Sequence, residues 1–177
     1  MILQTERLII RPYKESDLQE NFRLLSDKQN MYYLNDIICE TLEEARENLK
    51  ECIELFESGK ARRFAVELNG RLIGSVGYDV SEETPLGKIA HMGWFISPEF
   101  QGKGYVTEAA REIIKFGFTL DNLIRLTTGC YSENIPTQRV MEKLGFRKEG
   151  ERIKAQYHDG MMKDRTDYAI NRDEINL

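Results

Sequence analysis

The stretch of sequence that decides the fold is Ile96–Thr107, which reads ISPEFQGKGYVT. An apolar-rich run before it predicts a strand over Ile89–Ile96, and apolar residues at helical spacing follow it from Val106 onward. Gly102 and Gly104 lie between the two and let the backbone approach an anion without a Cβ in the way. A helix start leaves backbone N–H groups unpaired at its partly positive end. The stretch therefore indicates a phosphate cradle at a strand-to-helix turn.

Taken alone, a glycine pair before a helix also fits a plain turn or a dinucleotide-binding fingerprint. The chain has no GxxxxGK[ST] motif, which argues against a P-loop. Thr107 replaces the third glycine of a dinucleotide fingerprint, and the preceding strands look antiparallel, which does not suit a Rossmann unit. Lys103 can add a point charge to the cradle.

The periodicity of the whole chain predicts a mixed α/β architecture without repeats or Pro/Gly/Ser-rich linkers. Capping-box patterns at Ser16 and Thr41 predict two helix starts, Gly59 predicts a helix end, and Asn69-Gly70 predicts a hairpin. A polar loop is expected over Ser81–Gly87. The expected order is a strand (7–11), two helices (from 16 and from 41), three strands (64–68, 72–78, 89–96), a helix (106–116), a strand (123–130), a helix (134–144) and two strands (146–153, 162–170).

Length and composition bound the class of protein. The 177 residues, with 41% hydrophobic and 31% charged, predict one globular domain over 1–177. The net charge of -5 argues against broad nucleic-acid binding and is compatible with a cationic amine as substrate. Cys39, Cys52 and Cys130 are odd in number and scattered, so we expect reduced thiols in a cytoplasmic protein and no metal site. Neither a signal peptide nor a membrane span is expected.

Several motifs in one order resemble the GNAT superfamily of N-acetyltransferases. Gln101–Val106 resembles its Q/R-x-x-G-x-G/A motif, with Val106 where the family prefers Gly or Ala. Glu133–Phe146 is similar to the second cofactor segment of the superfamily. Three further segments resemble its RimJ/RimL-like branch, so that the likeness runs from about Thr5 to Tyr168: Thr5–Pro12, Leu72–Gly77 and Gly104–Ala109.

The resemblance implies a GNAT-like fold, with a V-shaped splay between the fourth and fifth strands, Ile89–Ile96 and Leu123–Cys130. It also implies transfer of an acetyl group from acetyl-CoA to an amine, by direct attack in a ternary complex. Neither a metal ion nor a covalent enzyme intermediate is expected.

The resemblance assigns roles toward acetyl-CoA to residues of this chain. The backbone of Phe95 and Ile96 would pair with the pantetheine arm, although both side chains also fit a plain core. Asn134 would bond the pantetheine arm, with a helix N-cap as the alternative. Arg139, together with Lys143, would approach the adenosine end, unless both lie on a solvated helix face. The backbone of one run would hold the pyrophosphate: Gln101, Gly102, Lys103, Gly104, Tyr105 and Val106.

The resemblance also suggests catalytic residues. His91 lies five residues before Ile96, where relatives such as histone acetyltransferases place a glutamate base. An imidazole can accept a proton near neutral pH, but a structural histidine is an open alternative. Many relatives place a tyrosine that acts as the general acid where this chain has Met141. Thr137 instead matches a hydroxyl of the RimL-like branch, which can hydrogen-bond the departing thiolate, with a hydroxyl that bonds the backbone of the first helix turn as the alternative.

A second histidine, His158, lies near the Asp159-Gly160 turn, and we expect it to be an exposed loop residue, with a substrate contact as the alternative.

The RimJ/RimL-like likeness favours a protein N-terminal or peptide amine as acceptor. Small amines, including polyamines, aminoglycosides and amino acids, are the alternative. A non-catalytic acyl-CoA-binding module and a nucleotide-binding domain are the competing classes of function. Family habit also implies that the chain can form a homodimer.

Overall fold

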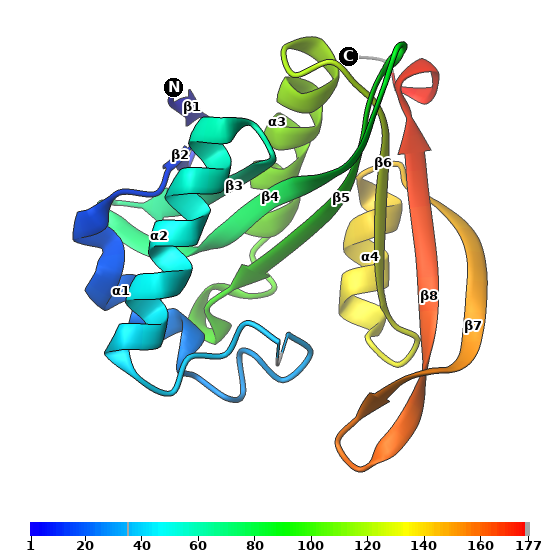
Figure 1. Ribbon diagram of the computed structural model, residues 1–177. Helices are drawn as coiled ribbons and strands as arrows, with labels where there is room; N and C mark the ends of the chain where they lie inside the picture. Colours follow the sequence, from blue (N-terminus) through cyan, green and yellow to red (C-terminus); the bar gives the residue numbers. More distant parts are fainter. Residues whose placement is uncertain (35, 176–177) are drawn as a thin grey trace. The chain divides into compact units, whose positions relative to one another are not determined.

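The computed structural model describes residues 1–34 and 36–175 (Figure 1). The chain forms two compact units, one of Met1–Asp79 with Gly93–Ile113 and the other of Val80–Met92 with Ile114–Leu177. The elements follow in the order β1 (Leu3–Gln4), β2 (Ile9–Pro12), η1 (Glu15–Asp17), α1 (Leu18–Leu25), α2 (Leu42–Ser58), β3 (Ala61–Leu68), β4 (Arg71–Thr84), β5 (Gly87–Ile96), η2 (Pro98–Phe100), α3 (Tyr105–Thr119), β6 (Leu123–Tyr131), α4 (Ile135–Lys143), β7 (Arg147–His158), β8 (Met161–Asn171) and η3 (Arg172–Glu174).

The fold is α/β, with a mixed sheet in the strand order β1-β2-β3-β4-β5-β6-β8-β7. β5 and β6 pair in parallel, with Lys88–His91 opposite Leu123–Thr127, whereas β6 and β7 each pair with β8 in antiparallel fashion. A parallel pair needs a crossover connection, and α3 supplies it here. The predicted element order is confirmed, with the short β1 as an addition. The splay between β5 and β6 stays a prediction.

In the first unit, local signals place α2 as predicted. The hydroxyl of Thr41 accepts the N–H of Glu44 at 3.2 Å, and the Glu44 carboxylate accepts the N–H of Thr41 at 3.1 Å. This capping box satisfies two of the N–H groups that a helix start leaves without a partner. Gly59 ends the helix with φ 76°, a left-handed conformation that costs glycine little.

The hairpin between β3 and β4 is also confirmed. Asn69 and Gly70 both have positive φ, 51° and 80°, which is the backbone of the tight turn that suits twisted antiparallel strands. Leu68 pairs with Arg71 directly across this turn.

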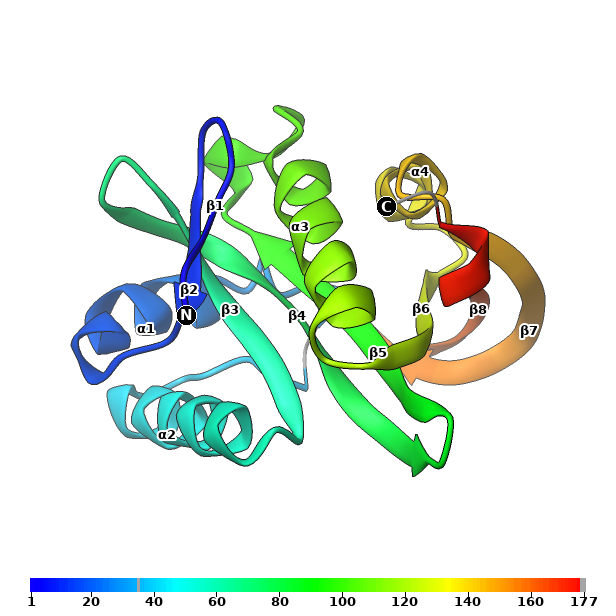
Figure 2. The ribbon, with the colours of Figure 1, turned by 90° about the horizontal axis from the view of Figure 1, so that it is seen from above.

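Helices cover both faces of the sheet in the first unit. Figure 2 shows α1 and α2 on one face of β2, β3 and β4, and α3 on the other. Ala109, Ala110 and Ile113 of α3 are fully buried. The opposite face has a core of Tyr13, Leu24, Leu49, Cys52, Ala65 and Leu72, with Phe95 packed against it. No helix in residues 1–34 and 36–175 is long and apolar enough to span a membrane.

Two boundary predictions in the first unit are wrong. β2 starts at Ile9 rather than Arg7, because residues Thr5 to Leu8 form a turn closed by a hydrogen bond from Thr5 N–H to Leu8 O (3.0 Å). The capping box predicted at Ser16 is replaced by η1, and α1 begins at Leu18. The carboxylate of Asp17 accepts the Lys14 N–H at 2.9 Å, so Asp17 takes over the capping role.

The polar loop predicted over Ser81–Gly87 is wrong, because β4 runs to Thr84 and β5 starts at Gly87. Hydrogen bonds from the hydroxyls of Ser81 to Ile89 O (3.1 Å) and Thr84 to Gly87 O (2.7 Å) bind the two strands together. Polar residues here occupy an exposed strand, which composition alone does not distinguish from a loop.

The second unit carries the hairpin of β7 and β8, whose turn residues Asp159 and Gly160 have φ 49° and 81°. The prediction for His158 is wrong: it is the last residue of β7 and only 4% exposed, with its ring 4.7 Å from that of Tyr131. Because β7 continues to the turn, the side chain points to one face of the strand instead of into a loop.

Candidate active site

The predicted phosphate cradle lies between η2 and α3. Gly102 and Gly104 have φ 73° and 81°, in the left-handed region that favours glycine. Among the described residues no atom lies within 4 Å of a Cβ built on Gly102, and the nearest one to Gly104 is Arg7 Nη2 at 3.6 Å. Both glycines are therefore needed for the backbone conformation rather than for space, and residues 101–104 are exposed.

The start of α3 supplies backbone donors to this loop. Glu108 N–H donates to Gly104 O at 3.0 Å, the first bond of the helix. The N–H groups before it have no partner within the helix, and the aligned peptide dipoles make this end partly positive. Val106 lies inside this first turn, so its side chain replaces the expected Gly or Ala without removing a donor. The loop and the helix start together form a site that suits an anion.

The side chains of the loop brace it. Gln101 Nε2 donates to Ile96 O at 3.1 Å, and Lys103 Nζ donates to Glu99 O at 2.9 Å. The Lys103 ammonium also lies 5.5 Å from the centre of the Phe100 ring, and the Tyr105 ring packs 6.4 Å from the same ring. The point charge expected from Lys103 is thus directed at η2, which leaves the backbone N–H groups as the donors of this loop that suit an anion.

The end of β5 orients its backbone by its pairing with β4. Ser97 N–H donates to Ile73 O at 2.8 Å, and a Cβ on Gly74 would come within 2.3 Å of the carbonyl oxygen of Phe95. Ser97 therefore directs its N–H at β4, and the missing Cβ of Gly74 leaves room for the Phe95 carbonyl oxygen. Because successive residues of a strand alternate, the backbone groups of Ile96 lie on the edge that does not face β4.

In the second unit, His91 is exposed on β5 and hydrogen-bonds a neighbouring strand. Its Nδ1 lies 3.1 Å from Thr127 Oγ1, directly across the parallel β5–β6 ladder. Thr127 Oγ1 also donates to Ala90 O at 3.3 Å. A hydroxyl has one hydrogen, so if Thr127 donates to Ala90, it accepts from His91 Nδ1–H. In the neutral imidazole, Nε2 is then the nitrogen that can take up a proton.

The start of α4 is capped by its own asparagine. Asn134 Oδ1 accepts the Thr137 N–H at 3.3 Å, and Asn134 O accepts the Gln138 N–H at 3.2 Å. The N-cap interpretation therefore holds for the side-chain oxygen of Asn134. Its amide nitrogen is a second polar group, which this cap does not use.

The other predicted residues of α4 differ in exposure. Thr137 is partly buried, Arg139 is exposed, and Met141 is 1% exposed in the core. Gln138 braces the helix start, because its Nε2 donates to Ser132 O at 2.8 Å and its Oε1 accepts from Tyr168 Oη at 3.2 Å.

The sequence model of the acetyltransferase (GNAT) domain matches residues 7–147, which is most of the chain. The chain belongs to the GNAT acetyltransferase family. Its place in the family is the RimJ/RimL-like branch, and it is an acetyl-CoA-dependent N-acetyltransferase.

Curated relatives of this acetyltransferase include proteins with and without a stated acceptor. It is 34% identical over 154 residues to the uncharacterized N-acetyltransferase YnaD of Bacillus subtilis, with 85% of each chain covered. It is 33% identical over 146 residues to the spermidine N(1)-acetyltransferase of Escherichia coli, which covers 80% of this chain and 74% of the relative.

Solved structures agree with the fold of this acetyltransferase over nearly its whole length. The ribosomal-protein-S5-alanine acetyltransferase of Vibrio fischeri is 25% identical, with a TM-score of 0.86 over 98% of this chain and 97% of that chain. The ribosomal L7/L12 α-N-protein acetyltransferase RimL, solved in complex with coenzyme A, is 20% identical, with a TM-score of 0.88 over 99% of this chain and 100% of that chain.

The cysteines of this acetyltransferase are poor nucleophiles. Burial raises the pKa of Cys130 to about 11, and burial also raises the pKa of Cys39 and of Cys52 above 9.0. A thiol with a raised pKa carries little thiolate at neutral pH, which argues against an acyl-cysteine intermediate. Within residues 1–34 and 36–175, no group of three or more His, Cys, Asp or Glu side chains is arranged to hold a metal ion.

Sequence reasoning missed two side chains of these regions, Thr127 and Gln138. A hydroxyl on a predicted strand carries no signal of its partner, because the partner depends on the strand register. The β5–β6 register alone shows that Thr127 lies opposite His91.

Proposed function

We propose that this enzyme acetylates the terminal amino group of a peptide or protein. The donor half of the proposal rests on one observation, the exposed glycine loop whose backbone donors start α3. The acceptor half is supported by the RimJ/RimL-like branch and by the likeness to the ribosomal-protein-S5-alanine acetyltransferase.

For the donor, we assign the pyrophosphate of acetyl-CoA to the backbone N–H groups from Gln101 to Val106. The alternation of β5 favours Ile96 over Phe95 as the backbone partner of the pantetheine arm. The amide nitrogen of Asn134 is a further donor to this arm, and the exposed Arg139 suits the phosphate at the adenosine end.

For the chemistry, we assign the base to His91. Nε2 removes a proton from the ammonium, directly or through water, and the neutral amine attacks the thioester carbonyl. A backbone N–H of β5 stabilises the oxyanion of the tetrahedral intermediate. Its collapse breaks the carbon–sulfur bond and releases the CoA thiolate, which the hydroxyl of Thr137 stabilises by a hydrogen bond. The attacking nitrogen loses its second proton to form the amide, and this proton passes to the thiolate, directly or through water.

A polyamine is the second candidate acceptor. It is favoured by the 33% identity to a spermidine acetyltransferase over 80% of the chain, and a net charge of -5 is compatible with a polycationic substrate.

The first test is calorimetric titration with acetyl-CoA, with NAD and ATP as controls, followed by a panel of acceptors. The panel holds peptides with N-terminal alanine or serine, the same peptides with blocked N-termini, spermidine, and an aminoglycoside, and release of free CoA is measured. We expect selective binding of acetyl-CoA and turnover with free N-termini. Turnover with spermidine alone would show that the acceptor is a polyamine and not a peptide amine. Binding of acetyl-CoA without any turnover would favour a non-catalytic module.

The base is tested by His91→Ala. We expect kcat to fall about 100-fold near neutral pH, with the KM for acetyl-CoA unchanged, because general base catalysis contributes on this scale. Thr127→Val should give a smaller loss, since it removes only the partner that orients the ring. A pH–rate profile that His91→Ala leaves unaltered would remove His91 as the base.

The single domain over residues 1–177, the cytoplasmic location and the homodimer remain predictions from the sequence. Size-exclusion chromatography with light scattering would determine the number of chains in the particle.

A further inference from the structure

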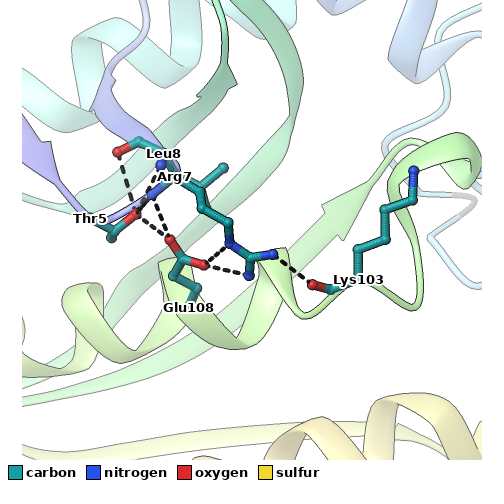
Figure 3. Close-up of polar contacts among 5 residues, drawn as sticks. All are labelled: Thr5, Arg7, Leu8, Lys103 and Glu108. Atoms are coloured by element: carbon teal, nitrogen blue, oxygen red, sulfur yellow. Dashed lines mark hydrogen bonds and ion pairs between the residues drawn. The ribbon is translucent and has the colours of Figure 1, made fainter.

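The segment Thr5–Pro12, which resembles the opening of the RimJ/RimL-like branch, has no part in the proposed chemistry. The structure shows where its first residues lie: the turn between β1 and β2 contacts the first turn of α3 (Figure 3). The helix that begins at the phosphate loop is therefore tied to a segment about 100 residues earlier in the chain.

Arg7 and Thr5 together occupy both carboxylate oxygens of Glu108. Thr5 Oγ1 and Arg7 N–H (3.2 Å) donate to Oε1, and Arg7 Nε donates to Oε2 at 2.7 Å. Partial burial by itself would raise the pKa of Glu108, but the hydrogen bonds from Thr5 and Arg7 outweigh it, and the net effect lowers the pKa below 4.5. Glu108 is therefore ionised at neutral pH and fully engaged.

Arg7 also reaches the loop itself. Its Nη1 donates to the carbonyl oxygen of Lys103 at 3.1 Å (Figure 3). Its guanidinium carbon also lies 4.4 Å from the centre of the Tyr105 ring. The contacts of Arg7 thus lie on both sides of Gly104, at the residue before it and one turn after it.

The hydrogen bond to Lys103 determines where the next amide points. A trans peptide is planar, so its C=O and its N–H point in opposite directions. Because Arg7 holds the Lys103 carbonyl, the N–H of Gly104 is directed away from Arg7. Gly104 has few restrictions on its own backbone, so this contact selects one orientation from many.

The charge of Glu108 matters for the same site. A carboxylate in the first turn of a helix interacts favourably with the partly positive helix end, but it repels a second anion that binds there. Arg7 compensates this charge, so that the loop can accept the negative diphosphate.

We propose that Arg7 is a positioning residue for the phosphate loop, which fixes the Lys103–Gly104 peptide and compensates Glu108. The inference rests on the proposed assignment of the pyrophosphate to this loop. Arg7 itself does not touch the reacting atoms.

The test compares Arg7→Ala with the matched control Arg71→Ala. Arg71 is similarly exposed and lies near η2, where it pairs with Glu99 Oε1 and lies 5.4 Å from the Phe100 ring. Among the residues that the structure describes, both of these contacts are to side chains, whereas Arg7 holds a backbone carbonyl. Kinetics are measured with acetyl-CoA and with S-acetylpantetheine, which lacks the diphosphate and the adenosine. Circular dichroism melting checks that each variant folds.

For Arg7→Ala we expect the KM for acetyl-CoA to rise about tenfold, with kcat within about twofold, because a charge-assisted contact is lost. The kinetics with S-acetylpantetheine and those of Arg71→Ala should stay unchanged. An unchanged KM for acetyl-CoA, or an equal loss with both donors, overturns the proposal.

A second readout does not depend on the truncated donor. Adding Glu108→Gln to Arg7→Ala removes the uncompensated charge, so the affinity for CoA measured by calorimetry should recover about threefold of the tenfold loss. Arg7→Lys should give an intermediate affinity, because lysine keeps the charge without the fork. No recovery in the double variant overturns the electrostatic part of the proposal.

If Gly104→Trp leaves CoA binding intact, the pyrophosphate assignment itself has failed, and this outcome is distinct from a failure of Arg7→Ala alone.

Discussion

α3 and α4 both begin at segments that resemble cofactor motifs of the family, yet their first turns are built differently. α3 follows Gly104, which has no side chain to cap the helix. In α4, Pro136 has no N–H, and the N–H of Thr137 donates to the side chain of Asn134. Local sequence thus decides which helix start keeps its donors for a ligand: a helix end binds an anion only where its own residues do not already satisfy the N–H groups.

The largest expected effect tests the open helix start. Gly104→Trp should weaken CoA binding more than about 100-fold, because a bulky side chain fills the cradle and the left-handed φ of 81° is strained for any L-residue. Gly160→Trp is the matched control, since Gly160 has the same φ of 81° in the β7–β8 turn. We expect a similar loss of stability there with CoA affinity unchanged. Equal affinity losses in both variants would contradict a specific cradle at Gly104.

The next effect tests whether the loop depends on the general stability of the first unit. Arg11 is 12% exposed and pairs with Asp17 (2.8 Å) and Glu67 (2.9 Å). Arg11→Ala should lower the free energy of unfolding by about 3 kcal/mol, because it leaves two mostly buried carboxylates without their partner. CoA affinity should stay unchanged in the folded protein. Urea unfolding and calorimetry measure the two quantities, and the exposed Arg46 serves as a control with a change below about 0.5 kcal/mol on alanine substitution.

A smaller effect separates the two roles of Asn134 at the capped helix start. Asn134→Ala should lower the free energy of unfolding by about 1 kcal/mol, the usual cost of a lost N-cap. Asn134→Asp keeps the cap oxygen and removes the amide N–H, so it should restore stability. If the KM for acetyl-CoA also returns to the native value in Asn134→Asp, the residue is a cap only, and our assignment to the pantetheine arm is wrong.

The smallest effect concerns the pH dependence of the Glu108 contact in α3. Its pKa is lowered in the folded protein, so the contact stabilises the fold above the unfolded pKa of about 4.3 and is lost as the pH falls through the folded pKa. The difference in melting temperature between the native protein and Glu108→Gln should therefore be largest at neutral pH and shrink below about pH 4.3. A constant difference down to pH 3 would show that the ionised carboxylate contributes nothing.

The parts of the fold that follow from short-range interactions could be predicted from the sequence. The capping box of Thr41 and Glu44, the Asn69-Gly70 turn and the glycine loop each depend on residues within four positions of one another. Their hydrogen bonds and φ values are dictated by residue type, so a pattern in the sequence is enough to identify them.

Other features could not be predicted, because they depend on which strands pair and in which register. His158 was expected in a loop, but the extension of β7 buries it against Tyr131. The polar run Ser81–Thr84 becomes strand, because β5 lies beside it.

The sequence by itself determined the class of reaction, because several family motifs occur in one order along the chain. It also determined the glycine turn before α3, because the conformational preferences of glycine are local. Only the tertiary structure decided that Thr127 orients His91 and that Arg7 holds Lys103 and Glu108, pairs that are separated by 36, 96 and 101 positions. Contacts between distant residues require the sheet register and the packing of α3 to be in place, and no local preference of the chain encodes them.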